Sequence, residues 1–119
     1  RRARQRQNPD EGLLVFGPLI IDCARREVKL DGTEVAMTQK DYELALFLLR
    51  NIGRLLSRGH ILEAVWGQSA DINTRTVDTH VSRIRGKLQL TPERGWRLSA
   101  VYQHGYRLER VAVEARQRA

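Results

Sequence analysis

The chain has 119 residues and a formal net charge of +7 at pH 7. This length accommodates one domain with a modest core and little room for a second. The strong positive charge favours an anionic partner, and DNA, RNA and an acidic membrane surface all fit that description. No apolar run approaches the roughly 20 residues that span a bilayer, and nothing resembles a signal peptide, so we expect a soluble protein with no membrane partner.

Cysteine and histidine usage argues against a disulfide framework and against a metal site. Cys23 is the only cysteine, so it forms no internal disulfide, which fits a reducing compartment such as the cytoplasm. Its apolar neighbours indicate a buried structural thiol rather than a nucleophile. The histidines lack the spacing of metal ligands, so we expect neither a metal nor another cofactor.

The chain opens with a segment that is unsuited to a folded core. Residues 1–12, RRARQRQNPDEG, carry four arginines and almost no apolar side chain. Because such a segment buries too little apolar surface to offset its conformational entropy, we expect a disordered arm or linker. Its sequence leaves open whether the arm itself binds phosphate.

The next segment carries the signals of a small antiparallel sheet. Leu13–Asp22 is an apolar run, interrupted by a Gly-Pro pair, that predicts β-strand. Glu27–Leu30 alternates with period two and meets Asp31-Gly32, a favoured two-residue hairpin turn. Glu34–Met37 then alternates again, which predicts the returning strand.

Two helices are predicted after this sheet. Thr38 caps the first helix, Asp41 follows three residues later as a shorter capping box, and Asn51 to Gly53 ends it. Ser57 begins a second, shorter helix, and Gly67 ends it. The apolar positions expected to face the core are Leu44, Phe47, Leu48 and Leu49 in the first helix and Ile61, Leu62, Val65 and Trp66 in the second.

Residues 74–88, capped by Asn73 or Thr74, predict a third helix with two different faces. Four apolar residues recur at i, i+4, i+7 and i+11, so they share a narrow wedge that we expect to be buried. These are Val77, Val81, Ile84 and Leu88. The opposite face is short-chained in the middle and basic around it, which suits close approach to a polyanion. It comprises Arg75, Thr79, Ser82, Arg83 and Gly86, flanked by Asp78 and Arg85 on one side and by His80 and Lys87 on the other.

A hairpin is predicted immediately after this helix. Trp96–Tyr102 has the composition of a strand, Gln103-His104-Gly105 turns the chain, and Tyr106–Leu108 returns it. A sheet, three helices and a hairpin define an α+β fold, the winged form of helix-turn-helix, with the hairpin 97–108 as its wing. We expect this domain to span residues 13–110 and to be followed by a polar tail, residues 111–119.

Five segments resemble the C-terminal effector domain of OmpR/PhoB-type response regulators, in the family order and at the family spacing. They are Met37–Leu46, Leu56–Arg58, Leu62–Gly67, Arg75–Arg85 (with Arg-Thr-Val-Asp-x-His-Val-Ser-Arg-Ile-Arg) and Gly105–Leu108 (Gly-Tyr-Arg-Leu). The resemblance implies a bacterial, cytoplasmic transcription regulator that binds specific sequences of double-stranded DNA through the helix 74–88. It further implies a receiver domain, served by a sensor kinase, that precedes this domain in the intact protein.

The resemblance also implies roles for individual residues. Positions that reach base edges are matched by Thr79 and Arg83, with Asp78 and Ser82 beside them. Positions that contact phosphates are matched by Arg75, His80, Arg85, Lys87, Trp66 and Gly67. As an acid in the first turn, Asp78 also suits the positive end of its helix, and this second use is favoured. The loop 68–73 resembles the segment through which activators of the family touch RNA polymerase, with Ile72 as the apolar contact.

Two positions depart from the family pattern. Gly86 stands where a lysine or arginine is common, and two interpretations are open: closer approach of the backbone to DNA, or a local irregularity of the helix. Tyr102 stands where an arginine commonly enters the minor groove from the wing. Arg97, His104 and Arg107 are the alternative wing contacts, although Arg107 belongs to the terminal motif and equally fits a structural role.

The sequence also bears on the oligomeric state of the protein and on two alternative functions. The chain offers no long apolar helix for a two-fold interface of its own, so we expect a monomer alone and a tandem dimer on direct-repeat DNA half-sites. An enzyme is disfavoured because Asp78, His80 and Ser82, at successive spacings of two, project about 200° apart on a helix and do not converge. A protein-interaction domain whose basic face only confers solubility is the third alternative.

Overall fold

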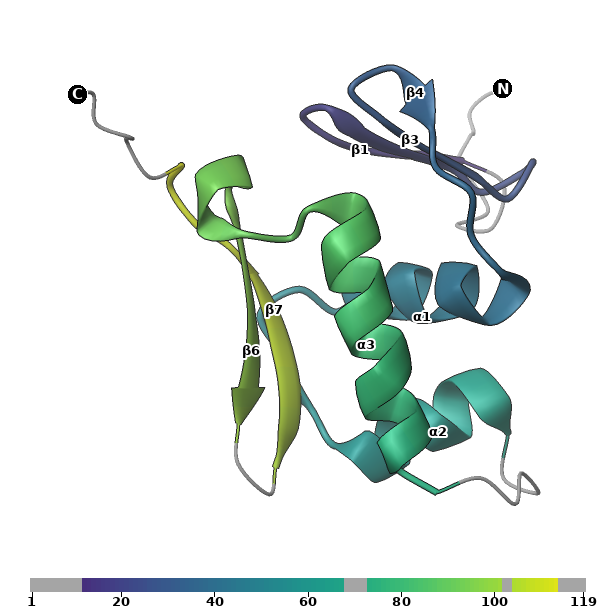
Figure 1. The fold of residues 1–119 in the computed structure, drawn as a ribbon, viewed down its shortest axis with the longest axis vertical. Coiled ribbons are helices and arrows are strands. Elements are labelled where there is room, and N and C mark those ends of the chain that lie inside the picture. Colours follow the sequence, from purple (N-terminus) through teal and green to yellow (C-terminus); the bar gives the residue numbers. More distant parts are fainter. Residues whose placement is uncertain (1–11, 68–72, 102–103, 114–119) are drawn as a thin grey trace, which may run out of the picture. The chain divides into compact units, whose positions relative to one another are not determined.

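The computed structural model describes residues 12–67, 73–101 and 104–113. They form two compact units, one ending at Thr38 and one beginning at Gln39 (Figure 1). The predicted arm up to residue 11, Ile72, Tyr102 and the tail from residue 114 lie outside the described residues. Within the described ranges, none of the helices has the length and apolar character needed to cross a membrane.

The first unit is an antiparallel sheet whose strands lie in chain order: β1 (Leu13–Phe16), β2 (Leu19–Asp22), β3 (Glu27–Leu30) and β4 (Thr33–Glu34). The apolar run that predicted strand is divided into β1 and β2, because Gly17 has a φ of +61° and turns the chain with Pro18. The turn predicted at Asp31-Gly32 is confirmed, but β4 ends at Glu34 rather than at Met37. Cys23 is a buried thiol, as expected.

The second unit packs three α-helices against a small antiparallel sheet (Figure 1). The helices are α1 (Gln39–Leu49), α2 (Arg58–Trp66) and α3 (Arg75–Leu88), followed by the 3₁₀-helix η2 (Pro92–Arg94). The sheet has the order β5-β7-β6 and comprises β5 (Leu55–Leu56), β6 (Trp96–Val101) and β7 (Gly105–Arg110). Strands β6 and β7 form the predicted hairpin, whereas β5 was not predicted.

Local side-chain bonds explain where α2 and α3 begin. The Ser57 hydroxyl accepts a hydrogen bond from the His60 backbone N–H at 3.0 Å, as expected of an N-cap. For α3 the cap is Asn73, whose side-chain oxygen accepts from the Arg75 N–H at 2.9 Å, while the Thr74 side chain makes no cap bond. Gly67, at a φ of +97°, ends α2.

The core of the second unit contains the apolar face of α3 that the sequence predicts. Its four members, Val77, Val81, Ile84 and Leu88, are at most 2% exposed. Ile61 and Val65 of α2 are also buried, whereas Leu62, Trp66 and Phe47, which were expected to face the core, are only half-buried. Trp96 is buried at the start of β6, with the Arg110 guanidinium 4.5 Å from its ring centroid.

Strand β5 and strand β7 approach each other unusually closely at Gly105. This residue has a φ of +129°, and a Cβ atom added to it would overlap the carbonyl oxygen of Leu56. Only glycine fits both the backbone conformation and the space. The glycine of the terminal Gly-Tyr-Arg-Leu segment therefore joins the turn end of the hairpin to the connection between α1 and α2.

Candidate nucleic-acid interface

The solvent-facing side of α3 is the one predicted from helical rotation. Each residue assigned to this face is exposed: Arg75, Thr79, Ser82, Arg83 and Gly86. The flanking residues are all half-buried: Asp78, His80, Arg85 and Lys87. The middle of the face thus carries short polar side chains and a glycine, with arginines at its margin, while the flanking charges turn toward neighbouring elements.

One flank of α3 is bound to a buried carboxylate from α1. The Asp41 side chain is 0% exposed, and its Oδ1 lies 2.7 Å from His80 Nδ1. Its Oδ2 lies 3.2 Å from Arg83 Nε and 3.8 Å from Lys87 Nζ. We call these four residues the Asp41 cluster. It ties the exposed Arg83, an expected base contact, to the interior of the domain.

Aromatic packing further fixes the imidazole of this cluster. The rings of Trp66 and His80 meet edge to face, with centroids 5.0 Å apart and an interplanar angle of 69°. The Arg83 Nη2 atom lies 3.3 Å from His80 Nδ1. Trp66 is half-buried at the end of α2, and Gly67 beside it is exposed, so the expected phosphate contact Trp66 adjoins the flank of α3 through His80.

The other flank of α3 is held by a second carboxylate cluster. Asp78 Oδ1 accepts a hydrogen bond from Arg58 Nε of α2 at 2.7 Å and one from the Tyr106 hydroxyl of β7 at 2.5 Å. We call these three residues the Asp78 cluster. Because two donors of the domain already bind this oxygen, Asp78 joins three elements together, which is a use that sequence reasoning did not assign to it.

The Asp78 cluster shifts the pKa values of its acidic members in opposite directions. Partial burial raises the pKa of the Asp78 carboxyl, but the hydrogen bonds from Tyr106 and Arg58 and the positive charge of Arg58 outweigh burial and hold the pKa below its ordinary value. Burial and the hydrogen bond to Asp78 raise the pKa of the Tyr106 phenol. Both shifts favour an ionised Asp78 carboxylate that accepts a hydrogen bond from the protonated hydroxyl of Tyr106.

Arg85, expected at a phosphate, makes its observed bond inside the domain. Its Nη2 donates to the carbonyl oxygen of Leu98 in β6 at 2.7 Å. This bond links the end of α3 to the hairpin. Next to it, α3 stays helical through Gly86 to Leu88, so the local irregularity considered for Gly86 is absent. A Cβ at Gly86 would meet no atom within 4 Å.

The hairpin places its expected contact residues in different environments. Arg97 is exposed, and its Nη1 lies 3.8 Å from Glu109 Oε1 on the neighbouring strand. His104 is exposed at the turn, where its backbone N–H donates to the Val101 carbonyl at 2.8 Å. Arg107 is half-buried and pairs with Leu55 of β5, in keeping with a structural role. Tyr102 lies outside the described residues.

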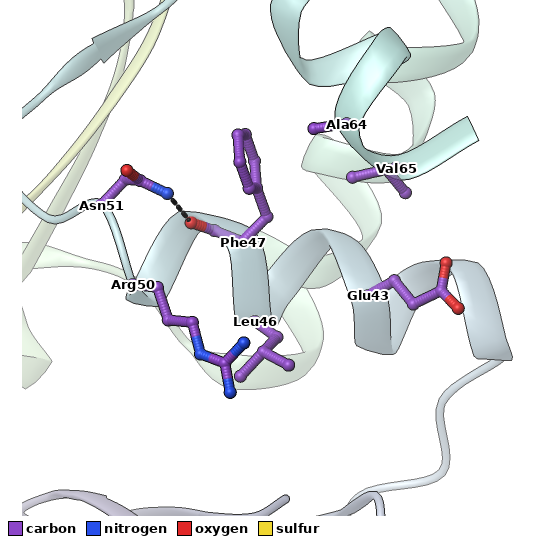
Figure 2. A pocket seen from close by; sticks show the side chains of 7 residues that line it. All are labelled: Glu43, Leu46, Phe47, Arg50, Asn51, Ala64 and Val65. Atoms are coloured by element: carbon purple, nitrogen blue, oxygen red, sulfur yellow. Dashed lines mark hydrogen bonds between the residues drawn. The ribbon is translucent and has the colours of Figure 1, made fainter. Parts of the chain in front are cut away.

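A separate pocket of about 230 Å³ lies between α1 and α2, where Phe47 points toward α2 (Figure 2). The Asn51 side chain donates to the Phe47 carbonyl at 2.8 Å at one end of it. The lining residues are Glu43, Leu46, Phe47, Arg50, Asn51, Ala64 and Val65. None of the expected DNA contacts lines this pocket, so it is distinct from the α3 face.

Sequence reasoning missed three residues that position α3: Asp41, Arg58 and Tyr106. Each carries a sequence signal that was assigned to something else. Asp41 was interpreted as part of a helix cap, while Arg58 and Tyr106 lie in two of the five family segments without an assigned role. Their partners lie 39, 20 and 28 residues away along the chain, which is beyond any local pattern.

Comparisons with known proteins agree with this geometry. Residues 32–108 match the family described as "Transcriptional regulatory protein, C terminal". The chain is 37% identical over 100 residues to the sensory transduction protein RegX3 of Mycolicibacterium smegmatis. The matched region covers 84% of this chain but only 44% of RegX3. The chain thus spans less than half the length of this relative.

Solved structures show the same fold. The response regulator DrrB of Thermotoga maritima, an OmpR/PhoB homologue, matches with a TM-score of 0.71 at 33% identity over 82% of this chain and 44% of DrrB. The RstA DNA-binding domain of Klebsiella pneumoniae, solved in complex with the RstA box, matches with a TM-score of 0.69 at 31% identity over 82% of this chain and 96% of that domain. The chain therefore belongs to the transcriptional regulatory C-terminal family, as a winged-helix domain of the OmpR/PhoB response-regulator type.

Proposed function

We propose that this chain is the output domain of a response regulator and binds specific sequences of double-stranded DNA with α3 in the major groove. The observation that carries the proposal is the exposed face of α3. Its centre of Thr79, Ser82 and Gly86 permits close approach to base edges, and the exposed Arg75 and Arg83 supply guanidinium groups. The similar RstA domain was solved in complex with its DNA box, which supports DNA binding by this chain.

The contacts refine which residues we assign to bases. Thr79 donates its hydroxyl to the Arg75 carbonyl at 3.3 Å, which leaves its oxygen as an acceptor and its methyl group for thymine. We assign Thr79, Ser82 and Arg83 to base edges, with Arg83 as the bidentate guanine contact. Asp78, whose Oδ1 is bound by Arg58 and Tyr106, we assign to support of α3 instead.

The phosphate contacts divide in the same way. We assign Arg75, Lys87, Trp66 and Gly67 to the sugar-phosphate backbone, with His80 contributing through the ring nitrogen that does not face Asp41. Arg85 is assigned to the α3–β6 contact because its guanidinium donates to Leu98. In the hairpin, Arg97 and His104 are the proposed wing contacts, since both side chains are exposed.

The remaining partners are proposed from the family resemblance and from the relatives, which are more than twice as long as the region that they share with this chain. We propose that a receiver domain and a sensor kinase regulate the intact protein in the cytoplasm, and that RNA polymerase is contacted through the loop that contains Ile72. Two copies would bind direct-repeat half-sites about one helical turn apart. Inserting about 5 bp between the half-sites places the second copy on the opposite face, so retained cooperativity would contradict the tandem arrangement.

The decisive experiment compares the DNA affinities of two arginine-to-alanine variants. Each is measured on a duplex that the unmodified chain selects from random sequence and on a scrambled duplex. Arg83→Ala should cost roughly 1 to 3 kcal/mol on the selected duplex and much less on the scrambled one, because a bidentate base contact is lost. Arg75→Ala, the matched control from the same exposed face, should weaken both duplexes alike. Fluorescence anisotropy measures all four affinities.

Salt dependence supplies the independent readout of this proposal. Each phosphate that the chain neutralises should contribute about −0.9 to the slope of log affinity against log salt concentration. A slope near zero, or a shift of neither duplex at low salt, would contradict DNA binding and favour the protein-interaction alternative. Equal losses on both duplexes for Arg83→Ala would contradict its assignment to a base.

A further inference from the structure

Asp41 is buried in a way that its position at a helix start does not require. It is the one charged side chain that is buried among the described residues, at 0% exposed. A carboxylate taken out of water loses hydration free energy that only close, well-aligned partners offset. An acid near the N-terminus of a helix is favourable at the surface as well, so the burial of Asp41 calls for an explanation in its partners.

Three basic side chains that contact Asp41 come from α3. They are His80, Arg83 and Lys87, at distances of 2.7, 3.2 and 3.8 Å. Spacings of three and four residues place them on one stripe of α3 that adjoins the exposed face. A residue of α1 with no exposed atoms therefore contacts the margin of the proposed DNA-binding face through three side chains.

The strongest consequence is for the orientation of Arg83. Its Nε lies 3.2 Å from Asp41 Oδ2 in an ion pair, and its Nη2 lies against the His80 ring, which Asp41 and Trp66 fix in turn. Two points of contact define the plane of a guanidinium group. A bidentate base contact requires a defined plane, and a side chain that is ordered before binding loses less conformational entropy when it binds.

We propose that Asp41 is a specificity-determining positioning residue, which orients Arg83 and His80 from the interior so that α3 discriminates between DNA sequences. The inference rests on the proposed DNA-binding function and deepens it. Asp41 also offsets the positive charge of Arg83 and Lys87, which limits their attraction to any phosphate backbone. Removing its charge should therefore weaken binding to the selected duplex while binding to the scrambled duplex stays equal or becomes tighter.

The test compares Asp41→Asn with Glu43→Gln, which removes the same charge from the same helix. Glu43 pairs with Lys40 at 3.1 Å and lines the α1–α2 pocket, away from the proposed contacts. We expect Asp41→Asn to lower the ratio of selected to scrambled affinity about tenfold, a part of what one bidentate contact provides. Glu43→Gln should change that ratio less than about twofold.

The outcomes separate this inference from the proposed function. If the unmodified chain and Glu43→Gln show no salt-sensitive DNA binding, the proposed function fails. If they bind and Asp41→Asn keeps the full ratio, or if both variants lose it equally, only the positioning role fails. A purely structural role would lower the active fraction, measured by stoichiometric titration, without changing the ratio of the two affinities.

A coupling measurement and a spectroscopic one complete the test. In an Arg83→Ala background, Asp41→Asn should reduce the ratio little further, because the two residues act as one unit. The unmodified chain provides a readout that needs no variant to fold, since an Arg83 side chain oriented by Asp41 and His80 should show restricted motion at Nε by NMR relaxation, both free and on the selected duplex. A freely mobile Arg83 Nε on that duplex would overturn the proposal.

Discussion

The Asp78 cluster and the Asp41 cluster hold the two flanks of α3 with opposite arrangements of charge. In the Asp78 cluster the carboxylate belongs to α3, and its donors come from α2 and β7. In the Asp41 cluster the carboxylate belongs to α1, and the basic side chains belong to α3. The hydrogen bonds of the first join Asp78 to Arg58 and Tyr106, which lie outside the exposed face of α3, whereas the second includes Arg83, which is exposed.

This difference indicates that one kind of interaction serves two purposes. The Asp78 cluster connects three elements of the fold, so its removal should act on folding stability and affect both duplexes equally. The Asp41 cluster reaches a residue proposed to contact bases, so its removal should act on discrimination between duplexes. Substitutions in the Asp78 cluster thus provide the contrast against which the Asp41 experiment is interpreted.

The largest expected effect is that of Asp78→Asn on stability. We expect the free energy of unfolding at pH 7 to fall by about 2 kcal/mol, because two charge-assisted hydrogen bonds weaken at a carboxylate that is 39% exposed. Since folding lowers the pKa of Asp78, its stabilisation is fully present above the ordinary value of 3.8 and is lost as the pH falls through the folded-state value.

Urea denaturation across the acidic range checks this expectation. The difference between Asp78→Asn and the unmodified chain should shrink below about pH 4. An unchanged difference down to pH 2 would contradict the ionised pairing. A fall in the ratio of selected to scrambled affinity larger than that of Asp41→Asn would break the contrast between the two clusters.

A smaller effect is expected for Tyr106→Phe, which removes one donor of the Asp78 cluster. The loss should be about 1 kcal/mol near neutral pH. Because folding raises the pKa of Tyr106 above 10.0, its contribution is present below that pH and is lost as the pH rises through the folded-state value. Denaturation series at pH 8 and above about pH 11 should show the difference disappear, and its persistence would contradict a protonated donor.

The smallest change is expected for Gly86→Ala, which belongs to neither cluster. Alanine should raise the free energy of unfolding by about 0.5 to 1 kcal/mol, since a Cβ meets no atom within 4 Å and glycine weakens a helix interior. Gly59→Ala, an equally open position in the first turn of α2, is the matched control and should give a smaller gain. A loss of stability from Gly86→Ala, measured by thermal unfolding, would contradict this account.

The sequence predicts which side of α3 faces solvent but not what its charged residues contact. Periodicity identifies a face, because rotation along a helix is regular. It does not identify a partner on another element, so Arg85 was expected at a phosphate although its guanidinium meets Leu98. The same limit applies to Asp78, for which the helix-end use favoured from sequence names neither Arg58 nor Tyr106.

Strand prediction fails in two places for a related reason. The apolar run before Asp22 contains the turn at Gly17, and its composition alone does not separate one strand from two. Strand β5 has two residues, fewer than a period-two pattern needs, and it exists through backbone pairing with β7. Longer elements with repeated apolar positions, such as α3 and the β6–β7 hairpin, were predicted within about two residues of their ends.

The close approach at Gly105 has a consequence for how this region tolerates mutation. Leu55 of β5 is 42% exposed, so many side chains fit there without disturbing the pairing. Gly105 admits none of them, since any Cβ would overlap the Leu56 carbonyl. The close contact between β5 and β7 thus depends on one residue that has no side chain, and a mutational scan should find Leu55 permissive and Gly105 intolerant of substitution.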